Sequence, residues 1–493
     1  MAEPWIKARF AVVGGGIAGV TCAETLAAEC PDESIVLITA SALIKAVTNY
    51  QKVSHTLETF DVEERPSAQV ESECPSVQVL HTVVTSLESE KKILHTAAGQ
   101  QISYDKLCIC TGGRPKLIPG QNQNVIGIRD TESVKEFQRK LSKATRVMIV
   151  GNGGIATELV YEVEGCDVLW IIKDRSISST FVDEGAGQFF LPHLNEEKKE
   201  AAPTVKRQKY TVGDGGSTEA QGDGTTLGGA LGPDWATCRQ MKGSAPVSHR
   251  VHVEYNVEVT RVMTIQEVAQ AGLNPLEPES LATSMNSEWP VYVELTNGQV
   301  YGCDLVVSAT GVAPHTDPFL SGNSFEVAED GGLKVNDKLQ TSVSDVFAAG
   351  DVCTASWERA DLWLQMRLWT QARQMGCYAA RSMVAAVKGE IISLDICFEL
   401  FAHVTKFFGY KVVLLGLFNA QGLGNDYELL LRVTKGEEYV KVVLHDGRLV
   451  GAILIGETDM EETLENLALN RTDLTPFKDH LLDPAVDIDD FFD

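Results

Sequence analysis

A chain of 493 residues is too long for one hydrophobic core, and typical domain sizes divide it into roughly three domains. Apolar residues make up 44% of it and charged residues 22%, which indicates that most of the chain is globular. The 42 Lys and Arg against 68 Asp and Glu give a net charge of −26, which argues against a surface that follows a phosphate backbone. We therefore expect no direct binding of nucleic acid.

The sequence also argues against a membrane protein. No apolar run approaches the roughly 18 residues of a span, and the longest, Val412 to Phe418, is interrupted by Gly416. The first nine residues lack the apolar core of a signal peptide and the Arg- and Ser-rich character of a transit peptide. Eleven Cys without dense spacing fit reduced thiols better than a disulfide framework. We expect a protein of the cytoplasm and nucleus with no membrane contact.

Residues 9–41 read as a strand, a glycine-rich turn, a helix and a second strand. The first strand is expected over Phe10 to Val13, the helix ends near Cys30, and the second strand covers Ile35 to Ile38. In a Gly-x-Gly-x-x-Gly turn the first glycine allows the bend, the second lets a pyrophosphate approach the backbone, and the third packs the helix closely. The alternative is a plain strand-to-helix connector. The predicted dinucleotide contacts are Gly14, Gly16, Ile17, Ala18 and Gly19.

The same pattern returns over residues 146–175. Here the strand is Val147 to Val150, the helix ends near Glu164, and the second strand is Val168 to Ile172. Ala156 stands in the place of the third glycine, a tolerated variant. The duplicated unit predicts two dinucleotide sites and therefore electron transfer between two cofactors. The expected contacts in the second turn are Gly151, Gly153, Gly154 and Ile155.

Each unit should next present an acidic residue that binds a ribose. The first unit departs from this rule, and the hydroxyls of Thr39 and Ser41, or the backbone, must substitute. The second unit offers Lys173 for the 2′-phosphate of NADP and Asp174 for the 2′-hydroxyl of NAD. The alternative for this second pair is a solvated charge cluster at a strand end.

Residues 195–248 break the pattern and are rich in glycine, which predicts a flexible insertion. Strands are expected over 251–262 and 291–294, with a hairpin turn at 297–298, and a helix over 363–387. After residue 391 the chain alternates in short strands, with a helix at 461–469, which predicts a separate α+β domain. The tail, 481–493, interleaves five Asp with apolar residues and either docks on a partner or packs back on this domain.

Three more segments complete a family pattern. The segments 107–115 and 305–311 are similar to Ala-Thr-Gly crossover segments, and 341–351 is similar to a second FAD fingerprint whose Asp binds the ribityl chain. With the two turns, they resemble the pyridine nucleotide-disulphide oxidoreductase family of flavoproteins. The resemblance implies an α/β fold with two Rossmann-like domains, for FAD and NAD(P)H, plus the C-terminal α+β domain. The additional cofactor contacts that it implies are Thr111, Gly112, Gly311, Gly350 and Asp351.

The resemblance also implies domain boundaries. The FAD-binding domain is expected over residues 1–143 and 313–388, the NAD(P)H-binding domain over 144–312, and the C-terminal domain over 389–493. The segments 44–49, 366–376 and 400–408 and the acidic tail resemble one group in the family that is associated with oxidative-stress protection. This group implies a redox-sensitive protein partner such as a tRNA ligase complex, an expectation that rests on the resemblance alone.

The cysteine pair of the family's disulphide reductases is missing. Those enzymes carry Cys-x-x-x-x-Cys after the first unit, whereas residues 41–60 contain no Cys. Their His-Pro-x-x-x-Glu motif is missing too, since His403 has other neighbours. Cys108 and Cys110 lie in an apolar strand, which favours a place in the core over a redox pair, and no metal site is expected.

Two further residues are flavin candidates by resemblance. Lys45 falls where related single-flavin reductases place a base near the flavin N5 edge, and a cation there favours anionic reduced flavin. The alternative is a surface lysine at a helix end. Gln365, expected at the start of a helix, contacts either the isoalloxazine or its own helix.

The predicted function is an FAD-dependent NAD(P)H oxidoreductase with a non-dithiol acceptor such as oxygen, a quinone or a protein. The alternative is an NAD(P)H-gated binding module with a stable charge-transfer complex and little turnover. The insertion and the acidic tail favour this alternative, because hydride transfer needs neither.

Overall fold

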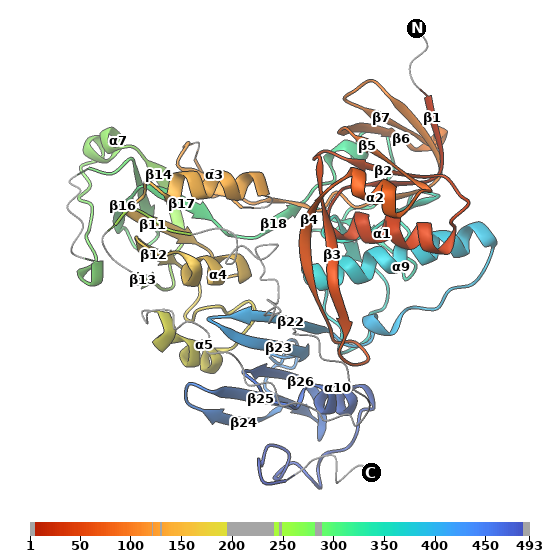
Figure 1. Ribbon diagram of the computed structural model, residues 1–493. Helices are drawn as coiled ribbons and strands as arrows, with labels where there is room; N and C mark the ends of the chain where they lie inside the picture. The colour runs from red at the N-terminus through yellow and green to blue at the C-terminus, as the bar shows by residue number, and fades with distance from the viewer. Residues whose placement is uncertain are drawn as a thin grey trace, which may run out of the picture.

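The computed structural model describes residues 5–120, 122–128, 131–194, 241–245, 249–281 and 288–486. Figure 1 shows them as three lobes, with the first lobe on the right, the second on the left and the third below. No helix among these residues is long and apolar enough to cross a membrane. The expected architecture of two α/β lobes and a smaller α+β lobe is confirmed.

The first lobe is built on a seven-stranded sheet of order β5-β2-β1-β8-β7-β6, with β20 paired to the end of β8. β1 pairs in parallel with β2 and β8, so the glycine turn after β1 leaves the middle of the sheet. The elements of the lobe are β1 (Trp5–Val13), α1 (Ile17–Glu29), β2 (Ile35–Thr39), α2 (Ala68–Glu73), β5 (Val77–His81), β6 (Val84–Glu88), β7 (Ile93–Thr96), β8 (Gln101–Ile109), α8 (Asp317–Leu320), β19 (Leu333–Val335), β20 (Val346–Ala348), β21 (Cys353–Ala355) and α9 (Trp369–Lys388).

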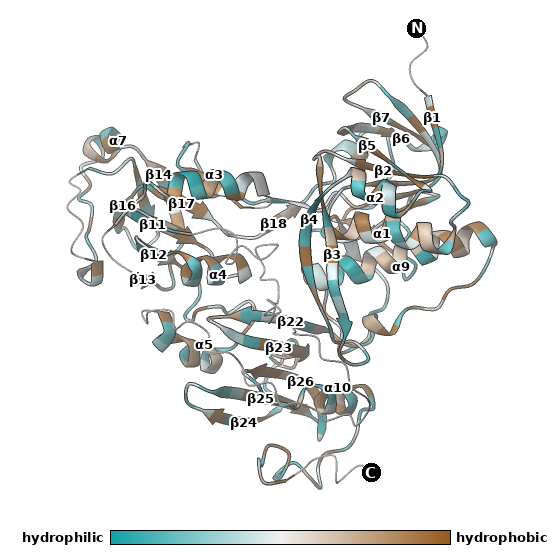
Figure 2. Ribbon diagram, in the orientation of Figure 1, coloured by the Kyte–Doolittle hydropathy of each residue, from teal (hydrophilic) through white to brown (hydrophobic). Residues whose placement is uncertain are grey.

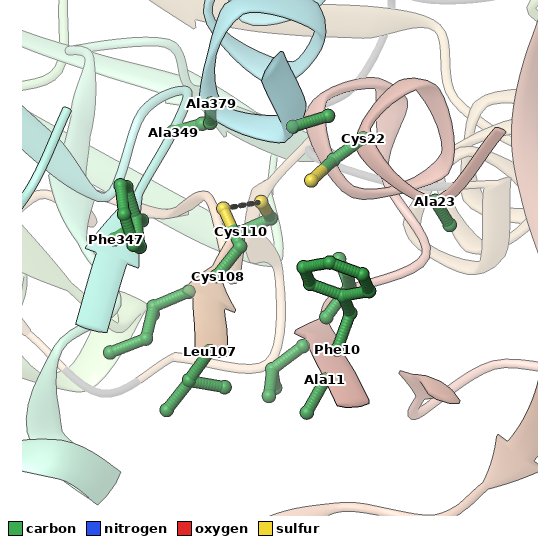
Figure 3. Packing of buried hydrophobic residues seen from close by; sticks show 14 of the residues in the cluster. Phe10, Ala11, Cys22, Ala23, Leu107, Cys108, Cys110, Phe347, Ala349 and Ala379 are labelled. Atoms are coloured by element: carbon green, nitrogen blue, oxygen red, sulfur yellow. Dashed lines mark hydrogen bonds between the residues drawn. The ribbon is translucent and has the colours of Figure 1, made fainter. Parts of the chain in front are cut away.

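Buried cysteines form part of the core of this lobe. Figure 3 shows Cys22, Cys108 and Cys110 among Phe10 and other apolar side chains, and the sulfurs of Cys108 and Cys110 are 3.5 Å apart. The hydrogen bond to Cys108 and burial raise the pKa of the Cys110 thiol well above its usual value. The prediction that the pair belongs to the core is confirmed. The ten cysteines that the structure describes are all free thiols.

The second lobe has a parallel sheet of order β10-β17-β11-β12-β13 and a three-stranded antiparallel sheet, β14-β15-β16. The hairpin predicted at 297–298 joins β15 to β16, and Gly298 supplies the positive φ of 81°. The elements are β10 (Val125–Gly127), α3 (Thr131–Leu141), β11 (Arg146–Val150), α4 (Gly154–Glu162), β12 (Asp167–Ile171), α5 (Glu184–Phe190), β13 (Arg250–Glu254), β14 (Val259–Met263), α7 (Ile265–Gln270), β15 (Val291–Leu295), β16 (Val300–Cys303) and β17 (Leu305–Ser308).

This lobe differs from the prediction in three places. It begins before residue 125 rather than at 144, because β10 pairs with β17 and Phe137 of α3 packs in its core. The strand expected over 251–262 is broken at Asn256, whose φ is 58°. Residues 241–245 of the expected insertion pack against the end of α4, where Met241 is buried and accepts a hydrogen bond from the Glu164 N–H. The other residues of that insertion, 195–240 and 246–248, lie outside the described residues.

Helix α9 begins at Trp369, so the prediction of a start at 363 is wrong. Amide side chains hold the preceding segment extended: Gln371 accepts a hydrogen bond from the Met366 N–H at 2.8 Å and donates one to the Leu364 carbonyl at 2.6 Å. These bonds compete with a helical backbone. The helix ends at Gly389, whose φ of 70° makes a left-handed cap.

The third lobe is an antiparallel sheet of order β22-β23-β26-β25-β24 with one helix, as predicted. Phe407 and Val412 on one face join the core of the second lobe, and Val413 and Leu415 on the other face pack with α10. Leu481 and Leu482 of the expected tail pack on this lobe, and residues 487–493 lie outside the described residues. The elements are β22 (Ala402–Phe407), β23 (Tyr410–Gly416), β24 (Glu428–Thr434), β25 (Glu438–His445), β26 (Arg448–Ile455) and α10 (Glu461–Leu469).

A hairpin of β3 (Leu43–Lys52) and β4 (Glu58–Pro66) connects the first lobe to the third. Its lower end is hydrophilic in Figure 2, yet Thr56 and Leu57 at its tip are buried against the third lobe. There the fully buried carboxylate of Glu465 in α10 accepts hydrogen bonds from the N–H groups of His55, Thr56 and Leu57 at 3.1, 2.5 and 3.2 Å. It also accepts one from the Thr56 hydroxyl. We call this contact the Glu465 clamp.

We predict that Glu465→Ala lowers the free energy of unfolding by about 2 to 4 kcal/mol, because buried N–H groups of the tip lose their acceptor. Thermal unfolding and protease cleavage at the tip measure this effect. The matched control is Glu462→Ala, an exposed position on the same helix, which should change stability by less than about 0.5 kcal/mol. Equal effects of the two substitutions would contradict the clamp.

Candidate functional site

One cavity of about 1780 Å³ lies between the three lobes, and both glycine turns open on it. Every predicted contact residue except Gly19 lines this cavity. The predicted residues in its wall are Gly14, Gly16, Ile17, Ala18, Thr39, Ser41, Lys45, Thr111, Gly112, Gly151, Gly153, Gly154, Ile155, Lys173, Asp174, Gly311, Gly350, Asp351 and Gln365.

The first turn has no room for a side chain at Gly14 or Gly19 and has open space at Gly16. A Cβ on Gly14, whose φ is 128°, would lie 2.2 Å from the Cys110 carbonyl oxygen, and one on Gly19 would lie 1.9 Å from the Gly14 oxygen. Gly19 therefore packs the helix and does not reach the cavity. At Gly16 the situation is reversed, since no described atom lies within 4 Å of its Cβ position. Gly16 is the N-cap of α1, and no described side chain caps the helix, so its first N–H groups are available to a pyrophosphate.

The second turn repeats this geometry. Gly151 has a φ of 129°, and its Cβ would lie 2.2 Å from the Ala309 oxygen. Gly153 caps α4, and no described atom occupies the space beside it. The two turns therefore fit two dinucleotides, one for each of the larger lobes.

The crossover residues shape the wall between the lobes. β9 (Gly113–Pro115) pairs with β18 (Val312–Pro314), and the Thr111 hydroxyl donates to the His315 carbonyl at 2.7 Å. Gly112 and Gly311 have positive φ values of 65° and 98°. These residues thus fix the two connections at the cavity.

The segment 341–351, which resembles the second FAD fingerprint, meets the start of helix α1 after the first turn. Gly350 has a φ of 80°, and a Cβ there would lie 3.0 Å from the Cβ of Ala18. The next residue, Asp351, lines the cavity, and its carbonyl accepts a hydrogen bond from Arg367 Nε at 3.0 Å. Sequence motifs more than 300 residues apart thus meet in one wall.

Thr39, the last residue of β2, packs against Gly15 of the first glycine turn. Its hydroxyl donates to the Ser41 carbonyl at 2.9 Å, and a Cβ on Gly15 would lie 2.4 Å from its oxygen. The Ser41 hydroxyl accepts from the Leu43 N–H at 3.1 Å and keeps its proton for a ligand. Of the two predicted hydroxyls, Ser41 is therefore the one with a donor left for a ribose.

At the end of β12, Asp174 is held by a residue that the sequence did not single out. Asn152 Nδ2 donates to Asp174 Oδ2 at 2.8 Å, and Asn152 Oδ1 accepts from the Ser178 N–H at 2.6 Å. Lys173 is exposed in the wall, and Arg175 pairs with Glu184 at 3.1 Å. The charge cluster is thus partly ordered, with Lys173 facing the cavity.

The two flavin candidates, Lys45 and Gln365, line the cavity. Lys45 is on β3, not at a helix end, and its Nζ lies 5.5 Å from the ring centroid of Trp369. Gln365 precedes α9 and caps no helix. Its amide accepts from the Ala355 N–H at 2.8 Å and donates to the Cys353 carbonyl at 2.9 Å.

Sequence reasoning set His403 aside, yet the structure brings it into the cavity wall. It lies on β22 of the third lobe, and its Nδ1 is 3.0 Å from the Thr370 hydroxyl of α9. Burial lowers the pKa of His403 to about 4, so the imidazole is neutral at pH 7. No local signal could reveal this position, because it depends on how the third lobe packs.

Comparisons with known proteins agree with this geometry. The pyridine nucleotide-disulphide oxidoreductase family matches residues 8–212 and 253–376, and the C-terminal domain of rubredoxin NAD+ reductase matches residues 402–472. The pyridine nucleotide-disulfide oxidoreductase domain-containing protein 1 of Danio rerio is 55% identical, over 99% of this chain and 98% of that protein. The chain belongs to the pyridine nucleotide-disulphide oxidoreductase family. As a member of this family, it is an FAD-dependent oxidoreductase that uses NAD(P)H.

Solved structures of low identity share the fold. A putidaredoxin reductase in covalent complex with putidaredoxin is 16% identical, with 98% of both chains covered and a TM-score of 0.65. The water-forming NADH oxidase of Lactobacillus brevis, bound to NADH, is 16% identical, with 95% of this chain and 92% of that chain covered and a TM-score of 0.63. The resemblance to two-dinucleotide flavoproteins is therefore confirmed.

We predict that Gly16→Val gives a folded protein that purifies without flavin. The new side chain enters the open space of the cavity, and the φ of −81° suits any residue. The matched variant Gly153→Val should keep its FAD and lose at least about 1.4 kcal/mol, or tenfold, in NADH affinity. Flavin absorbance and calorimetric titration measure the two effects. Full flavin content in Gly16→Val would show that FAD does not bind at this turn.

We predict that Lys173→Ala weakens NADPH binding by about 1 to 3 kcal/mol and leaves NADH binding nearly unchanged, because only NADPH has a 2′-phosphate. Titration with both nucleotides measures this difference. The control is Arg175→Ala, whose side chain pairs with Glu184. Equal losses for both nucleotides would show that Lys173 does not discriminate between them.

Proposed function

We propose that this oxidoreductase passes electrons from NAD(P)H through FAD to an acceptor that is not a dithiol of its own chain. The supporting observation is the hairpin β3–β4. Disulphide reductases carry a helix with their cysteine pair after the first unit, whereas residues 43–66 of this chain form a hairpin without cysteine. The chemistry of hydride transfer comes from the flavin, and the protein supplies position and charge.

The cysteines nearest the first turn are poor nucleophiles. Cys110 lines the cavity, but its pKa is raised by the hydrogen bond to Cys108 and by burial, so the reactive thiolate is disfavoured. Burial also raises the pKa of Cys353. This environment supports an acceptor from outside the chain.

We extend the proposal to the biological setting. The segments 44–49, 366–376 and 400–408 support a role in protecting a redox-sensitive protein partner, of which a tRNA ligase complex is the candidate, in the cytoplasm and nucleus. This part of the proposal rests on resemblance and is tested by co-purification from each compartment.

We predict that anaerobic NADH and NADPH each reduce the bound flavin in a stopped-flow experiment. When oxygen, a quinone or a candidate acceptor protein is added, steady turnover is expected with at least one of them. The Gly153→Val variant is the control, since it should retain flavin but need at least about tenfold more NADH for the same extent of reduction. A flavin that neither nucleotide reduces would contradict the proposal.

One surface favours a second function, an NAD(P)H-gated binding module. The edge strand β24 exposes an apolar row of Leu429, Leu431 and Val433, with exposed fractions of 49%, 57% and 48%. Such a row on an unpaired edge is typical of an interaction surface. A persistent long-wavelength band after NADH addition, with slow turnover under air, would favour this module over the enzyme.

A further inference from the structure

Glu58, the first residue of β4, has one carboxylate oxygen with no partner among the described residues. The side chain is 8% exposed and lines the cavity. Its Oε2 accepts from Arg373 at 2.8 Å and from the Tyr50 hydroxyl at 3.4 Å, while Oε1 is buried without a hydrogen bond. A buried polar atom of this kind calls for an explanation, because its desolvation costs free energy.

The surroundings hold this carboxyl in place. The Arg373 guanidinium stacks 3.8 Å from the centroid of the Tyr50 ring, so α9 and β3 fix it from two sides. One turn earlier on α9, Thr370 bonds His403, and Trp369 lies under Lys45. The Glu465 clamp holds the hairpin tip, residues 55–57, which directly precedes Glu58. The unpartnered oxygen is therefore not the result of a loosely held side chain.

The groups around Glu58 act on its protonation in opposite directions. Burial raises the pKa of Glu58 above its usual value, and Arg373 acts in the opposite direction. The other titratable groups that face it are Tyr50 and Lys52 on β3 and Cys397 on the segment before β22. Arg373 therefore supplies the main compensating charge, and a second negative charge in this cavity would favour protonation of Glu58.

We propose that Glu58 is the proton-holding group of the flavin cavity, which binds a solvent proton when the cofactor is reduced and gives that proton to the electron acceptor. The proposal rests on the proposed function above. It narrows the acceptor to a molecule that takes two electrons and two protons, such as a quinone.

The balance of each half-reaction is complete. NADH gives a hydride to FAD and leaves as NAD+, which adds one negative charge to the cavity, and Glu58 takes one proton from solvent. In the second half the reduced flavin returns the hydride equivalent to the quinone, and Glu58 adds its proton to give the hydroquinone. The cycle regenerates FAD and the ionised carboxylate.

The first test measures protons directly. Wild-type holoenzyme in weak buffer with a pH indicator is reduced anaerobically by one equivalent of NADH. At a pH between the pKa values of Glu58 in the oxidised and in the reduced enzyme, we expect uptake of close to one proton per flavin, and close to none in Glu58→Gln. The control is Glu63→Gln, an exposed position on the same strand, which should behave as wild type. No uptake by wild type, or equal uptake by Glu58→Gln, would overturn the proposal.

The second test reads the flavin potential and so does not depend on turnover. For a two-electron couple, each coupled proton contributes about 30 mV per pH unit. Glu58→Gln should therefore lose about 30 mV per pH unit of slope where Glu58 titrates, and an unchanged slope would overturn the proposal. If Glu58→Gln does not fold, Glu58→Asp takes its place and should shift the pH range of the steep region; an unshifted range would overturn it.

A third test concerns the acceptor. Glu58→Gln should slow reoxidation by a benzoquinone roughly 100-fold, the scale of general acid catalysis, and leave reoxidation by ferricyanide unchanged, since ferricyanide takes no proton. Equal slowing by both would overturn the proton-donor role. If NADH fails to reduce wild-type flavin at all, the proposed function itself fails, which is a separate outcome.

Discussion

The fold depends on a contact distance that only glycine permits. At Gly14 and at Gly151 a Cβ would stand 2.2 Å from a carbonyl oxygen of the neighbouring crossover segment. This approach lets the strand, the turn and the crossover meet at one point, and it directs the start of α1 or α4 at the cavity. Any side chain at Gly14 or Gly151 would separate these segments, and the cavity would lose a wall.

The hairpin β3–β4 joins the first lobe to the third beside that cavity. At its base the Lys45 N–H donates to the Gly15 carbonyl at 3.0 Å, and next to its tip Arg373 of α9 pairs with Glu58 at 2.8 Å. At its tip the Glu465 clamp fixes it to the third lobe. The hairpin thus ties the position of Lys45 to the packing of the C-terminal domain.

Sequence reasoning located the parts of the site that are local and missed those that depend on packing. The two turns follow from glycine spacing, because a short segment sets their backbone, whereas the crossovers and Gly350 follow from the resemblance to the family. Gln365 is expected at the start of a helix, since apolar spacing does not show that the Gln371 amide holds the segment before Trp369 extended. Lys45 is expected near the flavin only by resemblance, and nothing local shows that it lies on a strand. Glu58 and His403 reach the wall only because β4 and β22 meet α9, through contacts between residues that are 315 and 33 positions apart in the chain.

The acidic composition of the chain bears on how its cavity binds anions. The chain carries a net charge of −26, yet its cavity must accept two anionic dinucleotides. The helix N-termini at Gly16 and Gly153 offer fixed N–H dipoles at short range, where the distant surface charge is screened by salt. Few free cations are then needed near the flavin, and a carboxyl such as Glu58 is tolerated there beside Arg373.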